Sequence, residues 1–333
     1  MHAFSMEIHW ETILKTKFRL FFGSILASCA VQAFAAPSVV GNIDGYFMQG
    51  TQLTMSGWAC TQTSPQPIDV HVYAGGPYGS GGTLVAYGTA NFSSEPAVAS
   101  SCQSYGTTYR FRIVLSPQVM QTWGSKPLYV HGINNLGGAN SLLGGSGYFR
   151  VPHRVATLLG ARGDGYTDDT NALQAAISQG GLTYIPNTGS AYMISGPLKL
   201  GSNTEVMLDG KLMLKPGLQT AYDGEWYNPI TRRNEPRATQ WGMLQVVNNA
   251  SNVTISGRGV LDGNRAAYSR IANNGLGRGG NPNFREQTIC CVGGVVTGGP
   301  HLGSYDANIK NVVIRDITIQ NIPTWPIIDA APF

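Results

Sequence analysis

Residues 160–177 read GARGDGYTDDTNALQAAI, a stretch in which three aspartates and three glycines run into an alanine-rich segment. Leu173, Ala176 and Ile177 recur at the spacing of one helix face, with polar residues elsewhere on the wheel. The pair Gly180-Gly181 follows as a stop signal. The stretch therefore predicts one short amphipathic helix.

The aspartates before this helix could belong to a ligand loop or to the helix start. A calcium loop needs acidic ligands at alternate positions ending in a glutamate, and no glutamate follows; a phosphate loop needs a GK[ST] ending, which is missing. Asp168, Asp169 and Asn171 are residue types that accept hydrogen bonds from free amides at a helix start. We expect them to be structural caps, with no metal bound, and the sequence leaves open which one is the cap.

Three later segments share a short β-rich strand, a turn and a second strand. They are VMLDGKLML (206–214), VTISGRGVL (253–261) and VVIRDITIQ (312–320). Superimposing them aligns Leu208, Ile255 and Ile314 in the first strand, and Met213, Val260 and Ile319 in the second. Coils stacked in this way bury a continuous apolar column. Asn252 and Asn311 precede equivalent strands, which favours an asparagine ladder over a catalytic role.

Residues 37–150 show short alternating runs separated by loops rich in Gly, Ser, Pro and Asn. This period of two predicts half-buried antiparallel strands, and their number favours a β-sandwich. In YRFRIVL we expect Tyr109, Phe111 and Ile113 to face inward while Arg110 and Arg112 face water.

The first residues have the features of an export signal. A basic cluster, KTKFR (15–19), precedes the apolar run LFFGSILASCAV, and Ala33 and Ala35 fit a small-residue cleavage site. We expect residues 1–35 to be a signal peptide and the mature chain to be secreted, periplasmic or exposed at the cell surface. A lipoprotein signal ending at Cys29 is disfavoured because the apolar run continues through it, and the run is too short for a transmembrane helix.

Export would place the chain in an oxidising compartment, where Cys60 and Cys102 are expected to form a disulfide under Trp58. The state of the adjacent Cys290 and Cys291 is left open, because neighbouring cysteines bond each other only with strain. The formal net charge of +4 is too small to favour nucleic acid as a partner.

Three segments of the chain resemble a known superfamily. LGARGDGYTDDTNALQAAI, GGLTYIPNTGSAYMISGPLKL and VMLDGKLMLKPG resemble the N-terminal part of the pectate-lyase-like superfamily, and the closest likeness is to the polygalacturonase group of glycoside hydrolases. The resemblance implies an all-β chain with a right-handed parallel β-helix over residues 155–333 and a short helix capping its N-terminal end. GWAC and FRIVL in residues 37–150 resemble a β-sandwich module found beside carbohydrate-active domains.

The resemblance implies an exported polysaccharide-degrading enzyme, yet catalytic residues remain unassigned. The family's NTD, DD, GHG and RIK segments do not occur here in that order, so we expect the β-helix to be incomplete at its C-terminal end or closed by a partner. Asp209, Asp262 and Asp316 recur near turns and are interpreted as turn-forming residues. Two alternatives stay open: a non-catalytic polysaccharide-binding or adhesive surface protein, and a lyase, the one case in which a cofactor, calcium, is expected.

Two insertions supply the candidate substrate-binding residues. They are Trp226, Tyr227, Arg232, Arg233, Arg237 and Trp241 within residues 221–241, and Arg265 and Tyr268 within residues 262–285. Aromatic rings suit sugar stacking and guanidinium groups bind carboxylates in a bidentate manner, which predicts a polysaccharide partner containing uronates. The alternative is a solvated loop anchored by its aromatic residues. VLDGNRAAY resembles the family's DGNG segment, but Arg265 replaces the last glycine.

Overall fold

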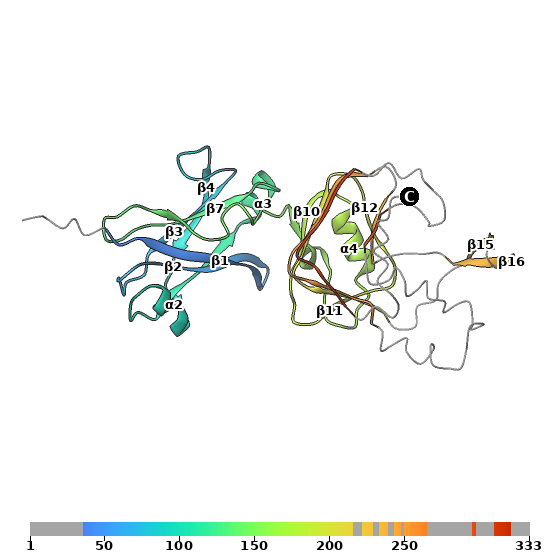
Figure 1. Cartoon of the computed structure of the whole chain (residues 1–333), viewed down its shortest axis with the longest axis horizontal. Helices are drawn as coiled ribbons and strands as arrows, with labels where there is room; N and C mark the ends of the chain where they lie inside the picture. The colour runs from blue at the N-terminus through green and yellow to red at the C-terminus, as the bar shows by residue number, and fades with distance from the viewer. Residues whose placement is uncertain are drawn as a thin grey trace, which may run out of the picture. The chain divides into compact units, whose positions relative to one another are not determined.

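The structure is a computed structural model that describes residues 36–215, 222–228, 233–238, 243–247, 250–264, 295–297 and 310–320. The chain divides into two compact units, Met1–Pro37 and Ser38–Phe333, and every element described below lies in the second. The regular structure in these residues is mostly β (Figure 1).

The N-terminal part of the second unit contains two antiparallel four-stranded sheets. The first has the order β1 (Val39–Gln49), β2 (Gln52–Thr61), β6 (Thr108–Leu115), β5 (Phe92–Ser93). The second has the order β4 (Thr83–Thr89), β3 (Asp69–Ala74), β7 (Leu128–Gly132), β8 (Ser141–Leu142). Two short helices that the sequence did not predict lie between strands, α2 (Pro96–Ser101) and α3 (Pro117–Trp123).

One apolar core contains side chains from both antiparallel sheets, among them Met55, Val70 and Phe111. In β6 the predicted inward face is confirmed: Tyr109 and Phe111 are 0% exposed and Ile113 is 3% exposed. Arg112 is exposed as predicted, whereas the side chain of Arg110 is 28% exposed and its Nη2 lies 2.8 Å from Glu95 Oε2. Because Phe111 is fully buried, replacing it with alanine would cost about 3–5 kcal/mol.

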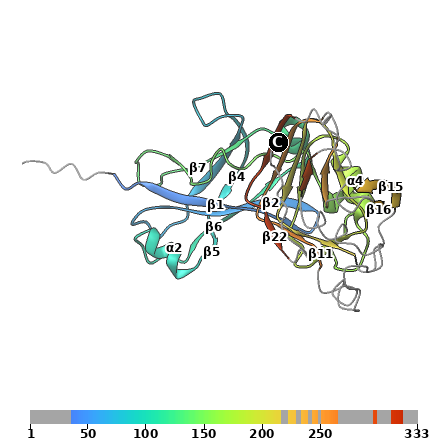
Figure 2. The same ribbon diagram turned by 45° about the vertical axis from the view of Figure 1, so that its right-hand side comes forward.

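The rest of the unit contains three parallel sheets. The β10 sheet has the order β9 (Arg154–Val155), β10 (Gly181–Ile185), β13 (Thr204–Leu208), β18 (Ser251–Ser256), β21 (Lys310–Ile314). The β11 sheet has the order β11 (Ala191–Ile194), β14 (Lys211–Leu214), β19 (Val260–Asp262), β22 (Thr318–Gln320), and the β12 sheet the order β12 (Leu198–Leu200), β17 (Leu244–Val246), β20 (Val295–Thr297). The chain visits the three sheets in turn, so each circuit adds one strand to each sheet (Figure 2).

The register of these circuits differs in part from the sequence alignment. Val206, not Leu208, pairs with Ile255, although Ile255 does pair with Ile314 as expected. In the next strand Lys211, not Met213, pairs with Val260, again a shift of two residues, and Ile319 pairs with Leu261 instead of Val260, a shift of one. The first shift is two residues, which keeps the same side chains facing the same side of the sheet. The apolar column is therefore preserved, and Val206 and Ile255 are both 0% exposed.

Asn252 stacks on an asparagine of the preceding circuit, Asn203, and its predicted stacking with Asn311 stays a prediction. Asn252 Nδ2 donates to Asn203 Oδ1 at 2.9 Å, and both residues have positive φ, 58° and 57°. Asparagine tolerates this left-handed conformation better than most residues. Asn203 directly precedes β13 and Asn252 is the second residue of β18, so this hydrogen bond fixes the register of the two strands. The side chain of the other predicted member, Asn311, lies outside the described residues.

The predicted helix is α4 (Thr170–Ile177), preceded by the 3-10 helix η1 (Ala156–Leu159). Its buried residues are Leu173, Ala176 and Ile177, as predicted. Leu173 and Ile177 pack into the same apolar cluster as residues of all three parallel sheets. This helix therefore shields the interior of the parallel strands (Figure 1).

The predicted disulfide is confirmed. Cys60 and Cys102 are bonded, with their Cα atoms 6.0 Å apart. Both are 0% exposed, and Trp58 packs against the cluster that they form with Val98 and Tyr109. A disulfide is compatible with a secreted protein. Cys290 and Cys291 lie outside the described residues. Within the described ranges, no helix combines the length and hydropathy needed to cross a membrane.

Candidate functional site

The two insertions leave the parallel strands at the same edge. One connects β14 to β17 and the other connects β19 to β20. Since β14 pairs with β19 and β17 pairs with β20, the two connections belong to successive circuits and follow each other along the stack. The strand ends that flank the two insertions are therefore neighbours, although they are far apart in the sequence.

The first insertion contains a two-stranded antiparallel sheet of β15 (Tyr222–Asn228) and β16 (Arg233–Ala238). Trp226 and Tyr227 are in β15, and Arg233 and Arg237 are in β16. In the register, Trp226 is opposite Glu235, Tyr227 is opposite Asn234, and Asn228 is opposite Arg233. The remaining candidates, Arg232, Trp241, Arg265 and Tyr268, lie outside the described residues.

A polar cluster occupies a different edge, where the chain passes from the β10 sheet to the β11 sheet. Asp209 follows β13, and its side chain is 11% exposed. Its carboxylate accepts hydrogen bonds from Tyr184 Oη (3.1 Å) and from the backbone amide of Arg258 (3.1 Å). The guanidinium of Arg258 lies 3.8 Å away. Burial and the nearby Asp209 raise the pKa of Tyr184, so this hydroxyl stays protonated and donates.

Asp316 occupies a similar place on a later circuit. Tyr148 Oη donates to Asp316 Oδ2 at 2.8 Å, and the guanidinium of Arg315 lies 4.8 Å from the centre of the Tyr148 ring. Burial raises the pKa of Tyr148, and the hydrogen bond to Asp316 raises it further. Each aspartate therefore has a tyrosine donor and an arginine near it, and Asp316 has a φ of 63°, as found in turns. This arrangement links coils and loops, and it favours a structural role for both carboxylates.

Asp169 stands at the N-cap position of α4, but its carboxylate does not accept a hydrogen bond from the helix. It is 1% exposed and accepts from the backbone amides of Arg162 (2.7 Å) and Gly163 (2.9 Å). Gly163 has a φ of 58°, and a Cβ there would lie 2.8 Å from the Tyr192 ring. The Asp169 carboxylate thus fixes the loop before the helix. The sequence had predicted that it would cap the helix instead.

Asp168 does contact the helix start. Its Oδ1 accepts from the Thr170 amide at 3.1 Å and from the Thr170 hydroxyl at 2.6 Å. Its Oδ2 lies 3.5 Å from Lys215 Nζ. Asn171 lies inside α4 and not at its cap position. Within the described residues, no three or more His, Cys, Asp or Glu side chains are grouped as a metal ion would require.

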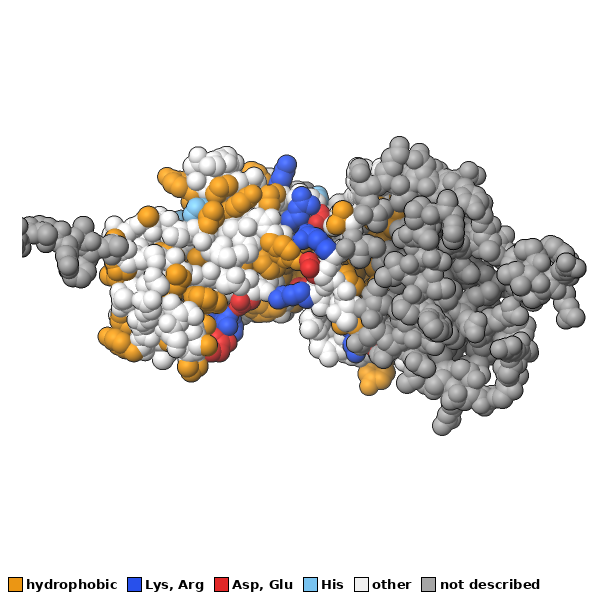
Figure 3. All heavy atoms as spheres, in the orientation of Figure 1, with side chains coloured by type: hydrophobic (Ala, Val, Ile, Leu, Met, Phe, Trp, Pro, Cys, Tyr) orange, Lys and Arg blue, Asp and Glu red, His pale blue; other side chains and the backbone are white. Residues whose placement is uncertain are grey.

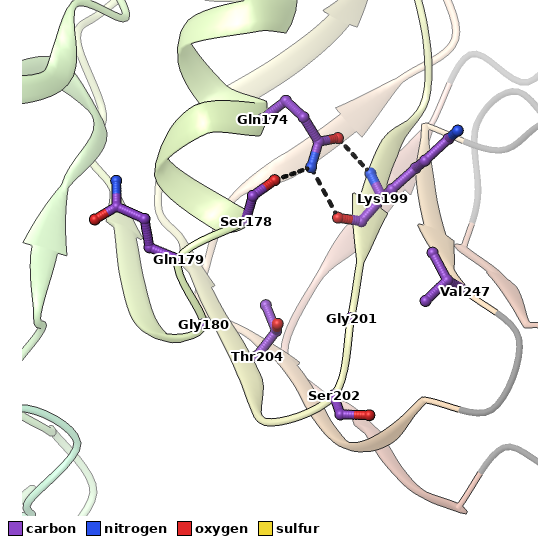
Figure 4. A pocket seen from close by; sticks show the side chains of 9 residues that line it. All are labelled: Gln174, Ser178, Gln179, Gly180, Lys199, Gly201, Ser202, Thr204 and Val247. Atoms are coloured by element: carbon purple, nitrogen blue, oxygen red, sulfur yellow. Dashed lines mark hydrogen bonds between the residues drawn. The ribbon is translucent and has the colours of Figure 1, made fainter.

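A cavity of about 580 Å³ lies beside the C-terminal end of α4 (Figure 4). Gln174 spans from the helix to β12: its Nε2 donates to Ser178 Oγ (2.8 Å) and to the Lys199 carbonyl (3.0 Å), and its Oε1 accepts from the Lys199 amide (2.7 Å). The side-chain amide of Gln174 thus hydrogen-bonds to the backbone of β12, the edge strand of its sheet. Without it, this carbonyl and this N–H group would be open to pairing with another strand. None of the described residues that line the cavity is a carboxylate.

A second cavity, of about 320 Å³, lies along β13 and β18. Arg150 Nη1 donates to Glu205 Oε2 at 2.8 Å in its wall, and the Asn203 and Asn252 turns form its rim. Glu205 is 7% exposed, and its Oε1 has no hydrogen-bond partner among the described residues. The arginine therefore supplies the charge compensation for this buried carboxylate.

Residues 154–275 match a family model described as "Rhamnogalacturonase A/epimerase, pectate lyase-like". The matched range contains α4, the first two circuits of parallel strands and the first insertion. The match supports the pectate-lyase-like superfamily for this part of the chain, and with it a pectin-related, carbohydrate-active protein. No curated protein and no solved structure matches the chain.

Proposed function

We propose that the chain is an exported polysaccharide-binding protein of the polygalacturonase-like type. In this proposal residues 1–35 are a signal peptide, residues 37–150 are a β-sandwich module, and residues 155–333 belong to a right-handed parallel β-helix. The two antiparallel sheets with a common core support the β-sandwich module. The three parallel sheets that the chain visits in turn support the β-helix. The family match over residues 154–275 supports the pectin-related ligand.

The observation that carries the proposal is the pairing of the strands that flank the two insertions. β14 pairs with β19 and β17 pairs with β20, and adjacent strands lie about 4.8 Å apart. Candidate aromatic and arginine residues on successive circuits would then form one surface along the stack, suited to an extended polymer. Arginine pairs with uronate carboxylates, and aromatic rings stack on sugar faces. Acidic glycans should therefore bind better than neutral ones at this edge.

We propose binding without cleavage for this chain. Glycoside hydrolysis needs one carboxyl group as proton donor and a second as nucleophile or base. The recurring turn aspartates Asp209 and Asp316 each accept a hydrogen bond from a tyrosine, which supports a structural role. The second candidate function, a lyase that uses calcium, rests on the superfamily match alone. An adhesive surface protein would use the same binding edge.

Binding of the purified mature chain, Ala36–Phe333, to polygalacturonate and to a neutral glycan of equal length tests the proposal. Affinity for polygalacturonate should be several-fold higher, and the difference should shrink between low and high salt because exposed ion pairs are screened. The double variant Arg233→Ala/Arg237→Ala should lose this preference. Arg112→Ala, an exposed arginine on β6, is the control for loss of positive charge and should keep it.

Equal affinity for acidic and neutral glycans would contradict the arginine assignment. Release of reducing ends from polygalacturonate would contradict the claim that the chain does not cleave. Double-bond formation that depends on added calcium, detected by ultraviolet absorbance, would favour the lyase.

A further inference from the structure

The outer face of the second antiparallel sheet carries a group of aromatic and imidazole side chains that the proposed function does not use. They are His71 and Tyr73 on β3, Tyr87 on β4, Tyr129 and His131 on β7, and Tyr78 in the loop after β3. We call these six residues the tyrosine–histidine face. The alternate residues of β3 and β7, Val70, Val72 and Val130, are 0% exposed and form part of the core.

The register of the strands brings these rings together across three neighbouring strands. His71 on the central strand β3 is opposite Tyr87 on one side and His131 on the other, and Tyr73 is opposite Tyr129. Adjacent strands lie about 4.8 Å apart, so the face extends over about 10 Å of the sheet.

Five of the six rings, all but that of Tyr129, form a connected set. The Tyr73 ring centre lies 5.4 Å from that of His131 and 5.7 Å from that of Tyr78. His71 lies 6.4 Å from Tyr73 and 6.4 Å from Tyr87. The backbone amide of Tyr78 donates to His131 Nε2 at 3.3 Å, which ties the loop to the sheet. Aromatic pairs at these separations hold one another in defined orientations, so the face is preorganised.

Several of these rings face solvent. Tyr78 is 71% exposed and Tyr87 is 75% exposed, whereas Tyr73, in the middle of the set, is 8% exposed and supports its neighbours instead of facing solvent. Leu84 and Leu142, each 46% exposed, pair with Tyr73 and His131 and extend the apolar surface. In Figure 3, hydrophobic side chains and a histidine lie together over the part of the molecule where Figure 1 places β4 and β7. Contiguous exposed apolar surface of this kind marks an interaction site.

We propose that the tyrosine–histidine face binds the sugar rings of a neutral polysaccharide chain. Aromatic faces pack against the apolar C–H side of a sugar ring, while tyrosine hydroxyls and imidazole nitrogens can exchange hydrogen bonds with its hydroxyl groups. None of the six side chains is a carboxylate, a lysine or an arginine, so the face offers no strong partner for a uronate. The nearby Asp69 on β3 is engaged by the Thr89 hydroxyl at 2.8 Å.

This charge character separates the face from the arginine-bearing insertions. The insertions suit acidic chains, whereas the face suits neutral ones. The choice of a polysaccharide over another occupant rests on the proposed function. A protein with both surfaces would hold acidic and neutral segments of one polymer at the same time.

The test uses the mature chain and the double variant Tyr78→Ala/Tyr87→Ala, because both side chains are largely exposed and their removal should leave the fold intact. The control is Tyr105→Ala/Tyr166→Ala, which removes two tyrosines that are 86% and 87% exposed elsewhere. Affinity is measured by calorimetry and gel retardation against linear galactan, arabinan and glucan, and against polygalacturonate. Circular dichroism of each variant verifies the fold.

The Tyr78/Tyr87 variant should bind at least one neutral glycan about tenfold more weakly than the parent, and the control variant should bind it unchanged. Polygalacturonate binding should persist in the Tyr78/Tyr87 variant and fall in the Arg233/Arg237 variant, so that failure of one site is distinguishable from failure of the other. Absence of neutral-glycan binding by the parent would overturn the proposal. Self-association of the parent that the Tyr78/Tyr87 variant abolishes would overturn it too, and would identify a second copy of the chain as the occupant.

Discussion

Loss of the Cys60–Cys102 disulfide should destabilise the N-terminal part of the chain by about 4 kcal/mol. The bond joins residues separated by 42 positions. In the chain-entropy treatment, a loop of that length in the unfolded state loses enough freedom to stabilise the folded state by about 4 kcal/mol at 25 °C. Both cysteines are 0% exposed, so the double variant Cys60→Ala/Cys102→Ala keeps the core apolar while removing the bond.

The assay is urea unfolding followed by circular dichroism and tryptophan fluorescence, since Trp58 packs against the disulfide cluster. With a slope of about 2 kcal/mol per molar urea, the midpoint of the transition that reports on this cluster should fall by about 2 M. Dithiothreitol should shift the parent by a similar amount and leave that transition unchanged in the double variant.

A shift below about 0.5 M would refute the entropic reasoning, because loop closure would then contribute little to stability. Free thiols at both positions in protein recovered from an oxidising compartment would refute the bond itself. A large shift in the variant with none under dithiothreitol would assign the effect to lost packing and not to the cross-link.

Asp169→Ala should cost about 2–4 kcal/mol in thermal unfolding, because two backbone amides lose their acceptor in a buried site, whereas Asp168→Ala should cost about 1 kcal/mol; equal losses would contradict this. Arg150→Ala should cost about 1–3 kcal/mol by leaving the Glu205 carboxylate without its donor, and Glu205→Gln in the same background should recover part of it. The carboxyl of Asp164 should titrate near pH 2, because hydrogen bonds led by one from a backbone amide lower its pKa to about 2. Since this folded-state pKa is depressed, its contribution to stability is present above the ordinary value of 3.8 and is lost as the pH falls toward 2; an NMR titration midpoint near 3.8 would contradict the assignment.

The sequence was sufficient to predict the type of element and its buried face wherever the pattern is local. The alternation in β6 and the buried face of α4 follow from backbone geometry alone, since side chains alternate along a strand and recur every three to four residues along a helix. The same alternation is visible in DVHVYA and PLYVHGI, where valines alternate with His71, Tyr73, Tyr129 and His131. Short helices such as α2 were missed because six residues carry too little periodicity to be recognised.

The partners of the charged and polar residues were decided only by the tertiary structure. Asp169 occupies the position of a helix cap, yet its carboxylate accepts from amides that a preceding loop brings to it. Tyr184 and Asp209 meet because β10 and β13 are neighbours in one sheet. Sequence spacing states which residues can hydrogen-bond, but many arrangements of a loop satisfy the same local preference.

The sequence by itself determined that apolar columns would form from stacked coils, because any even register buries the same side chains. It did not determine the register itself. Ile255 pairs with Val206, two residues from the aligned Leu208, and Ile319 pairs with Leu261, one residue from the aligned Val260. The hydrogen bond between Asn203 and Asn252 selects among registers that the hydrophobic pattern leaves equivalent. In the same way, the order β4-β3-β7 assembles the tyrosine–histidine face from three segments, since strand neighbours depend on chain closure over distances that no local pattern records.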